Sequence, residues 1–333
     1  MPSHLLIALS FQVKIKLCSD EGVAKMRHFL EVGDLKPKEI DAIVSAALRW
    51  RKSGYPRTRP LRDKTVVLVF QKPSTRTRVS FQAAVAKLGG ESMYLGWSEL
   101  QLGRGESVED TGKVLARYVD CIVARVFGHG DLVELAKNGR IPVINALSDR
   151  HHPCQALADL MTIYMYSKKP YQSKVAFVGD GNNVCVSLMQ VCAAAGVDIT
   201  VATPPSHRPP EEEVKKALKV AEETGASVIL TDDPREAVRN ADFVYTDVFV
   251  SMGQEAERNR KLADFLPTYQ VNASLMSHAK PTAKFMHCMP MHLGEEVTPE
   301  VAYGPQSVIY DQAENRMHTE ASLLAYLLRG MVK

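Results

Sequence analysis

Residues 65–81 read TVVLVFQKPSTRTRVSF, and this stretch decides the fold class. Thr65–Phe70 is a continuous apolar run rich in β-branched residues, which is typical of a parallel strand covered by helices on both faces. After the loop residues 71–73, helical spacing begins with Val79 and Phe81. A buried strand that turns directly into a helix is the repeating unit of an α/β protein.

Short apolar runs of the same kind recur along the chain, and helical stretches lie between most of them. The further runs are Met93–Leu95, Cys121–Val126, Pro142–Asn145, Val175–Val178, Ile199–Ala202, Val228–Leu230, Phe243–Thr246, Phe285–His287 and Val308–Tyr310. This alternation predicts about ten strands in two sets of five, and therefore an α/β fold with two doubly wound parallel sheets. A long amphipathic segment from Gln312 to Leu328 is predicted to form the last helix.

The chain length of 333 residues suggests two domains. We place the boundary near Leu147–His152 and expect a first domain over residues 26–148, a second over 149–310 and a C-terminal helix within 311–333. Residues 1–25 are expected to be an extension. Leu5–Val13 is mostly apolar, but no Lys or Arg precedes it and no Arg precedes Arg27, so it is a poor signal or transit peptide.

The composition excludes several classes of protein. Lys and Arg total 41, Asp and Glu total 38, and a net charge of +3 argues against a dedicated nucleic-acid binder. No apolar run reaches the roughly 18 residues of a membrane span. The six cysteines form no C-x-x-C pair, which favours free thiols in a reducing cytoplasm over disulfides or a zinc ribbon. We therefore expect a cytoplasmic protein with neither nucleic-acid nor membrane partners.

Hydroxyl and guanidinium groups cluster in Ser74–Arg78, where the predicted strand gives way to a helix. The unpaired N–H groups and the positive dipole end of a helix N-terminus favour an anion, and an arginine can grip phosphate bidentately. The ordinary alternative is a Ser/Thr cap with solvated arginines. Five such residues in a row favour the anion site. The lysine-based P-loop motif is absent.

Two further segments point to the same chemistry. Arg125 ends a predicted strand, and a buried arginine without a partner would be unfavourable, so an anion is expected nearby. His152-Pro153-Cys154-Gln155 precedes a helical run. Pro153 suits the first helical position, which leaves His152 at the cap and lets His152 and Gln155 project from one helix end. A purely structural cap is the alternative for His152.

Three motifs lie in the second half of the chain. Gly179–Asn183 suggests a dinucleotide fingerprint, but Val184 stands at the third glycine position and no acidic residue follows the next strand. Asp247 ends a predicted strand and suits a cationic ligand, with a solvated loop carboxylate as the alternative. A zinc site would use His287, Cys288 and His292, which is three ligands at most. A buried inert cysteine is the usual alternative.

The segment S-T-R-T-R-x-S-F at residues 74–81 resembles the carbamoyl-phosphate signature of the aspartate/ornithine carbamoyltransferase family. Four more segments resemble that family: H-P-x-Q at 152–155, D-x-x-x-S-M-G at 247–253, H-C-x-P at 287–290 and E-N-R at 314–316. The resemblance extends from about Met26 to the C-terminus. It implies transfer of the carbamoyl group of carbamoyl phosphate to the side-chain amine of L-ornithine, giving L-citrulline and phosphate. It also implies a role in arginine metabolism, no metal or organic cofactor, a homotrimer or a multiple of trimers, and a C-terminal helix that packs back on the first domain.

The resemblance assigns roles to particular residues. Carbamoyl-phosphate binding is assigned to Ser74, Thr75, Arg76, Thr77, Arg125, His152, Gln155, Cys288, Met289 and Arg316. Ornithine binding is assigned to Asn183, Asp247, Ser251 and Met252. Among these, Arg76, Arg125, His152, Cys288 and Arg316 would be catalytic. By this resemblance, His152 and Arg316 would contact the carbamoyl carbonyl oxygen. Gln155 would contact the carbamoyl amide, and Cys288 would lie beside the attacking amine.

Three departures from the family pattern stand out. Phe249 replaces a common Trp, and Met289 replaces Leu, which leaves a backbone contact intact. Many relatives use a Gln from a neighbouring subunit to reach carbamoyl phosphate. Ser98 aligns there, so that contact is shortened, lost or supplied by Gln101.

Rival interpretations remain at this point. Putrescine has no carboxylate for the Ser-Met-Gly segment, N-acetylornithine lacks a free ammonium for Asp247, and an acidic acceptor such as aspartate would want cationic groups where Asp247 stands. A non-catalytic anion-binding module does not explain why residue sets for both substrates are present. A dinucleotide oxidoreductase is the third alternative.

Overall fold

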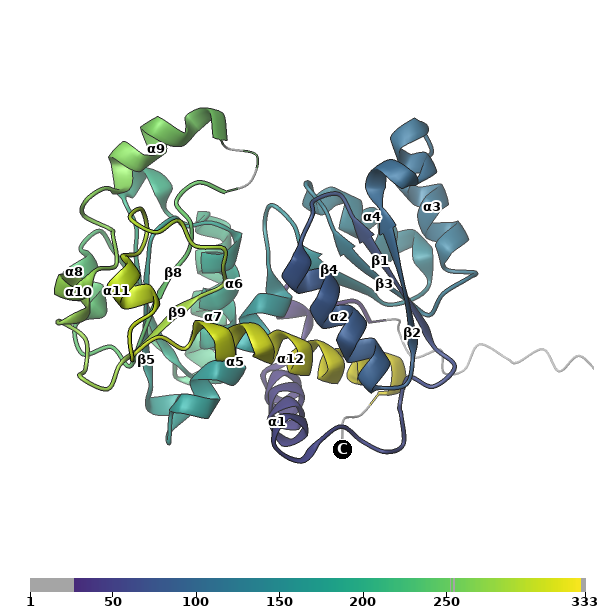
Figure 1. Cartoon of the computed structure of the whole chain (residues 1–333), viewed down its shortest axis with the longest axis horizontal. Coiled ribbons are helices and arrows are strands. Elements are labelled where there is room, and N and C mark those ends of the chain that lie inside the picture. The colour runs from purple at the N-terminus through teal and green to yellow at the C-terminus, as the bar shows by residue number, and fades with distance from the viewer. Residues whose placement is uncertain (1–26, 252, 254, 331–333) are drawn as a thin grey trace, which may run out of the picture.

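The computed structural model describes residues 27–251, 253 and 255–330. The expected extension over residues 1–25 and the predicted ligand Met252 lie outside the described residues. Two α/β lobes lie side by side, and one long helix, α12 (Ile309–Arg329), runs across both (Figure 1). The predicted fold class is confirmed, because each lobe has its own parallel sheet. The predicted boundary near residues 148 and 149 stays a prediction.

The first lobe holds a parallel sheet of order β2-β1-β3-β4. Its strands are β1 (Thr65–Phe70), β2 (Glu91–Gly96), β3 (Cys121–Arg125) and β4 (Val143–Leu147). Its helices are α1 (Pro37–Ser53), α2 (Thr75–Lys87), α3 (Val108–Leu115) and α4 (His129–Gly139). From β1 the chain passes to β2 on one side and then to β3 on the other, so the direction of winding reverses between β1 and β3. In doubly wound sheets, ligands bind outside the carboxyl ends of the strands at such a switch point.

The second lobe holds a parallel sheet of order β7-β6-β5-β8-β9. Its strands are β5 (Lys174–Val178), β6 (Asp198–Ala202), β7 (Val228–Thr231), β8 (Phe243–Thr246) and β9 (Lys284–His287). Its helices are α6 (Asn183–Ala195), α7 (Glu211–Thr224), α8 (Pro234–Val238), α9 (Arg258–Phe265), α10 (Ala273–Met276) and α11 (Pro299–Ala302). Helix α5 (Pro153–Tyr166) joins the lobes. The switch point lies between β5 and β8.

The prediction of a strand at Val308–Tyr310 is wrong, and the described part of the chain has nine strands rather than ten. Ser307 makes a single parallel bridge with Phe285, and helix α12 begins at Ile309. Val308 and Ile309 are buried at the start of this helix, so their apolar character reflects packing of a helix end. On the first sheet, Phe29 makes an isolated bridge with Ile144 at the β4 edge.

Helix α12 packs against α5, α1 and α2, as expected of a C-terminal helix that returns to the first domain. Its Leu323 and Leu324 are fully buried, and each such side chain stabilises the folded state by about 1.5–3 kcal/mol. Ser322 Oγ donates to the carbonyl of Ile43 at 2.8 Å. Helix α12 therefore joins the core of the first lobe although it follows the second in sequence.

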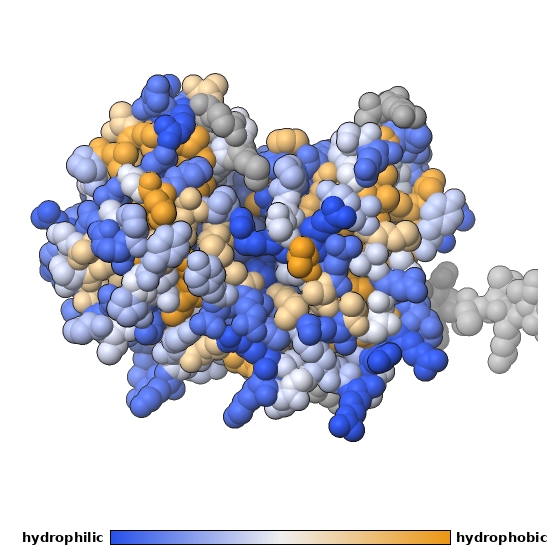
Figure 2. Space-filling model, viewed as in Figure 1, coloured by the Kyte–Doolittle hydropathy of each residue, from blue (hydrophilic) through white to orange (hydrophobic). Residues whose placement is uncertain are grey.

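None of the helices in the described part of the chain is both long and apolar enough to cross a lipid bilayer. The cysteines described by the structure are free, in agreement with the sequence; Cys18 lies outside that part. Figure 2 shows the molecule hollowed between the two lobes, with hydrophilic side chains around the hollow.

Candidate active site

A cavity of about 610 Å³ lies between the lobes, where the carboxyl ends of both sheets face each other. The predicted site residues that line it are Ser74, Thr75, Arg76, Thr77, Arg125, His152, Asn183, Asp247, Ser251, Cys288, Met289 and Arg316. They are spread over about 240 positions of the sequence, and the two switch points bring them together. Gln155 lies outside this lining.

The first-lobe end of the cavity is built on the turn from β1 into α2. Ser74 caps the helix, and its hydroxyl oxygen accepts a hydrogen bond from the backbone N–H of Thr77 at 3.3 Å. Arg76 lies in the first turn and lines the cavity. Helix N–H groups, a hydroxyl cap and a guanidinium together make a site for a dianion such as phosphate.

Arg125 stands beside this helix end, because β3 pairs with β1 in a register that sets Arg125 against Phe70. Its side chain is buried, and its Nε has no hydrogen-bond partner among the described residues. Burial, together with nearby Arg316 and Arg76, lowers the pKa of Arg125 to about 10. Among the described residues Arg125 has no ion pair, so a buried guanidinium beside other guanidiniums favours binding of an anion at this end of the cavity.

Arg316 reaches the cavity from α12 and is fully buried. Its guanidinium donates to Gln155 Oε1 at 2.9 Å and to Thr77 Oγ1 at 3.3 Å, and it pairs with Glu320 at 2.7 Å. Gln155 thus stands behind Arg316 and orients it. Gln155 in turn donates to Asp159, whose pKa burial raises to about 7.

His152 is the N-cap residue of α5, with Pro153 in the first turn, as the sequence predicts. Its side chain lines the cavity and is buried. Burial lowers the pKa of His152 well below its usual range, and the positive charges of Arg316, Arg125 and Arg76 add to that effect. The imidazole is therefore neutral at physiological pH and can donate one ring N–H to a carbonyl oxygen.

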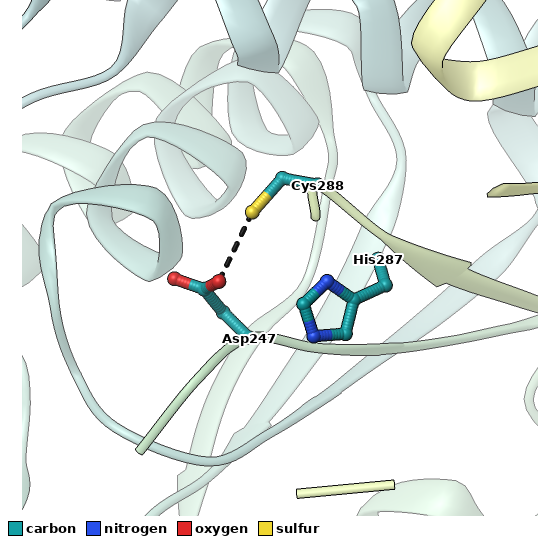
Figure 3. Close-up of side chains that lie close together, drawn as sticks. All are labelled: Asp247, His287 and Cys288. Atoms are coloured by element: carbon teal, nitrogen blue, oxygen red, sulfur yellow. Dashed lines mark hydrogen bonds between the residues drawn. The ribbon is translucent and has the colours of Figure 1, made fainter. Parts of the chain in front are cut away.

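The second-lobe end of the cavity is built on two neighbouring strand ends. Strands β8 and β9 pair with Thr246 opposite His287, so the next residues, Asp247 and Cys288, emerge side by side. Figure 3 shows the Cys288 thiol facing the Asp247 carboxylate, with the His287 ring beside them; the Sγ–Oδ1 distance is 3.0 Å. Asp247 Oδ2 also accepts a hydrogen bond from Asn182 Nδ2 at 2.8 Å.

Burial raises the pKa of the Cys288 thiol well above its usual range, and the Asp247 carboxylate raises it further. A thiolate is the nucleophilic form of cysteine. Cys288 is therefore a hydrogen-bonding thiol here rather than an activated nucleophile.

His287 fixes the backbone that follows Cys288. Its Nδ1 accepts a hydrogen bond from the Met289 N–H at 2.8 Å, and its Nε2 lies 3.1 Å from Glu296 Oε1. Met289 has a φ of +57°, which is uncommon for a residue with a side chain. Asp247, His287 and Cys288 lie close enough to share a metal ion. Such an ion would have to displace one of the hydrogen bonds of His287.

Asn183 is the first residue of α6 and lines the cavity. Its side-chain amide donates to the carbonyl of Ser148, between the lobes, at 2.6 Å. Ser251 lines the same end of the cavity.

Sequence reasoning assigned no substrate role to three ionisable residues that line the cavity: Lys72, which follows β1, and Arg258 and His292. Arg258 was not singled out, and His292 was considered only as a zinc ligand. Both follow strands that end at the cavity, β8 and β9, which is the only sequence signal for them. Ser98 does not line this cavity but a neighbouring groove at the carboxyl ends of β1 and β2, and Pro73 lines both.

Comparison with known proteins gives a consistent result. The family model for the aspartate/ornithine carbamoyltransferase carbamoyl-phosphate-binding domain matches residues 27–165, and that for the Asp/Orn-binding domain matches residues 171–327. The chain is 50% identical over 306 residues to an ornithine carbamoyltransferase of Bacillus thuringiensis subsp. konkukian, covering 92% of this chain and 95% of that one. It is 51% identical over 310 residues to one of Pyrococcus abyssi, covering 92% and 97%.

Solved structures agree. The ornithine carbamoyltransferase from Pyrococcus furiosus superposes with a TM-score of 0.86 at 50% identity, covering 92% of this chain and 98% of that one. The anabolic ornithine carbamoyltransferase from Campylobacter jejuni subsp. jejuni superposes with a TM-score of 0.87 at 39% identity, covering 91% and 99%.

Proposed function

This chain belongs to the aspartate/ornithine carbamoyltransferase family, and from that premise we propose that it transfers the carbamoyl group of carbamoyl phosphate to the side-chain amine of L-ornithine. The products are L-citrulline and phosphate. The proposal is supported above all by the buried guanidinium of Arg125. Its charged neighbours are Arg76 and Arg316, and its Nε has no hydrogen-bond partner among the described residues, so it favours a bound anion. The cavity joins this end directly to the Asp247 and Cys288 end.

Carbamoyl phosphate binds with its phosphate group at the N-terminus of α2. Ser74, Thr75, Thr77 and the backbone N–H groups donate to the phosphate oxygens, and Arg76 and Arg125 supply opposite charge. These side chains line one end of the cavity. The site is built before substrate arrives, because the α2 cap and the β1–β3 register fix it.

The carbamoyl carbonyl oxygen points toward His152 and Arg316. Negative charge develops on this oxygen as the amine attacks, and preorganised hydrogen-bond donors stabilise it. His152 is neutral and can donate one ring N–H, and Arg316 is held in place by Gln155 and Glu320. The carbonyl of Met289 accepts from the carbamoyl amide, in a backbone conformation that His287 holds.

The acceptor binds at the second-lobe end. Asp247 pairs with the α-ammonium, Asn183 and Ser251 donate to the α-carboxylate, and Cys288 lies beside the side-chain amine. We assign Met252 to the carboxylate as well, on the family resemblance. The neutral side-chain amine attacks the carbonyl carbon and forms the new C–N bond. The bond between that carbon and the bridging phosphate oxygen then breaks, and the departing phosphate takes the proton of the amine. Positioning and electrostatics therefore supply most of the rate.

We further propose a cytoplasmic homotrimer, or a multiple of trimers, that acts in arginine biosynthesis. Family membership supports this proposal. We expect a neighbouring subunit at the groove that Ser98 lines, at the carboxyl ends of β1 and β2. Ser98 or Gln101 would supply the inter-subunit contact to carbamoyl phosphate.

The deciding experiment measures citrulline and phosphate formation with carbamoyl phosphate and a panel of amines. L-Ornithine should be the preferred acceptor over putrescine, N-acetylornithine, L-lysine and L-aspartate. An anion-binding module would bind carbamoyl phosphate and release no phosphate with any amine. Preference for another amine in the panel would move the assignment to that carbamoyltransferase.

A further inference from the structure

We propose that Arg258 recognises the α-carboxylate of the acceptor, giving up its ion pair with Glu295 to do so. Arg258 would then be a specificity-determining residue that selects amino-acid acceptors over diamines. This inference rests on the proposed function, because it concerns the acceptor end of the same cavity.

Arg258 joins two segments that border the acceptor end. It is the first residue of α9 and lines the cavity, as do Asp247 and Ser251 on the segment leading to α9. Its guanidinium pairs with Glu295, which lies on the segment that leaves Cys288. The Arg258 side chain is 48% exposed, so water and a ligand can both reach it.

The helix that carries Arg258 is held in place. Lys261 pairs with Asp180 on the β5–α6 turn at 2.7 Å. Phe265 stacks on Phe249 with ring centroids 4.5 Å apart. Arg258 therefore projects from an anchored helix, and rotation about its side-chain bonds is enough to redirect it from Glu295 into the cavity.

The charges around the cavity call for a cation at this position. Among the described lining residues, Asp247 is the only carboxylate, and it would repel the carboxylate of an acceptor. Asn183 and Ser251 are uncharged. Arg316 belongs to α12, which packs on the first lobe, so Arg258 is the permanent cation that the described second lobe brings to the lining.

Glu295 has a second partner available when Arg258 leaves. Its Oε2 is buried and has no hydrogen-bond partner among the described residues. His292 also lines the cavity, and its Nδ1 lies 3.8 Å from that oxygen. The exchange therefore leaves neither carboxylate isolated: the substrate gains Arg258, and Glu295 keeps His292 as a neighbour.

The experiment compares L-ornithine with L-ornithinamide, which keeps both amines and replaces the carboxylate by an uncharged amide. The assay is run at a pH that keeps the α-amine of ornithinamide protonated. Arg258→Gln should raise KM for ornithine about tenfold, the lower end for a charged hydrogen bond because the site is half-exposed. It should leave kcat/KM for ornithinamide and KM for carbamoyl phosphate within about twofold.

Two variants fix the sign of the effect. Arg258→Lys keeps the charge and should retain most of the affinity for ornithine. Glu295→Gln removes the competing carboxylate and should leave KM for ornithine equal or lower. Lys215→Gln, which breaks an exposed ion pair with Glu211 on α7, is the matched control and should behave as the unmodified enzyme.

An unchanged KM for ornithine in Arg258→Gln overturns the inference. So does an equal loss with ornithine and ornithinamide, which would mean a structural role for Arg258. Both outcomes leave the proposed function standing. Absence of citrulline formation by the unmodified enzyme overturns the proposed function, and this inference with it.

Discussion

The two ends of the cavity differ in how their charged and polar side chains are paired. At the first-lobe end, Arg76, Arg125 and Arg316 crowd together, and the buried Nε of Arg125 has no hydrogen-bond partner among the described residues. At the second-lobe end, polar groups satisfy one another: Asp247 accepts from Asn182 and from the Cys288 thiol. The first-lobe end therefore carries excess positive charge, whereas the polar side chains of the second-lobe end are already hydrogen-bonded to one another.

This difference indicates how each substrate is recognised. Carbamoyl phosphate is expected to fill an existing charge deficit, so its site needs little rearrangement. Ornithine is expected to exchange partners with groups that are already bonded, so its recognition depends on matching each of them. Discrimination between similar ligands should therefore be sharper at the acceptor end, because an analogue that lacks one group leaves a buried partner unpaired.

The largest expected effect tests that discrimination. Putrescine offers the same reacting amine as ornithine but has no carboxylate, and kcat/KM for ornithine should exceed that for putrescine by about 10⁴-fold. Asp247→Asn should lower kcat/KM for ornithine far more than for putrescine and so narrow the gap. Steady-state assays of both amines with both proteins measure this. If putrescine matches ornithine with the unmodified enzyme, Asp247 and its neighbours do not recognise an amino acid.

The next effect tests the charge deficit at the first-lobe end. Arg76→Ala should lower kcat/KM for carbamoyl phosphate on the order of tenfold to a few hundredfold, since a charged hydrogen bond contributes about 1.5–3 kcal/mol. Arg76→Lys should be nearly as damaging, because a point charge does not replace a bidentate fork. Arg62→Ala, at a side chain that is 79% exposed, serves as the control. Full activity of Arg76→Ala would remove the phosphate site from α2.

The pairing of Cys288 with Asp247 makes a prediction about pH. Because burial and Asp247 raise the pKa of the Cys288 thiol, its thiolate fraction near pH 8 should lie below that of an ordinary cysteine. Alkylation of Cys288 by iodoacetamide should be correspondingly slow and should keep rising as the pH increases. Asp247→Asn should speed it. A plateau of the alkylation rate below about pH 8 would show that the thiol is already ionised there, which would contradict a hydrogen bond from the Cys288 thiol to the Asp247 carboxylate.

The smallest effect concerns the role of the same thiol in turnover. If Cys288 only orients the attacking amine, Cys288→Ser should retain activity, with kcat/KM for ornithine lowered about two- to tenfold, as for a neutral hydrogen bond. Initial-rate patterns should indicate a ternary complex. Isolation of a carbamoyl thioester, or ping-pong kinetics, would instead make Cys288 a nucleophile.

Much of this arrangement could be predicted because parallel strands end at a common edge. Asp247 and Cys288 are separated by 41 positions, yet each follows a buried apolar run, and those runs became neighbouring strands. Arg125 was predicted for the same reason. The alternation of apolar runs with helical stretches gave the fold class, since few other folds bury so many short strands on both faces.

The failures also have physical causes. Val308–Tyr310 looked like a strand because the apolar start of a buried helix and a short buried strand have the same composition. Phe29 was overlooked because a single bridge needs no apolar run. Arg258 and His292 were missed because their positions depend on the path of irregular segments after β8 and β9. Gln155 lies behind Arg316, because the direction of α5 sets it there, and its assignment to the carbamoyl amide stays a prediction.

Helix α12 has a consequence for how the protein is made. Arg316 completes the first-lobe end of the cavity, but it is delivered by a helix that begins at Ile309, after both sheets have been synthesised. A growing chain can therefore form the α2 turn and the β1–β3 register long before it can hold the carbonyl oxygen of its substrate. Full competence to bind and activate carbamoyl phosphate should arise abruptly, late in translation, when α12 emerges and docks.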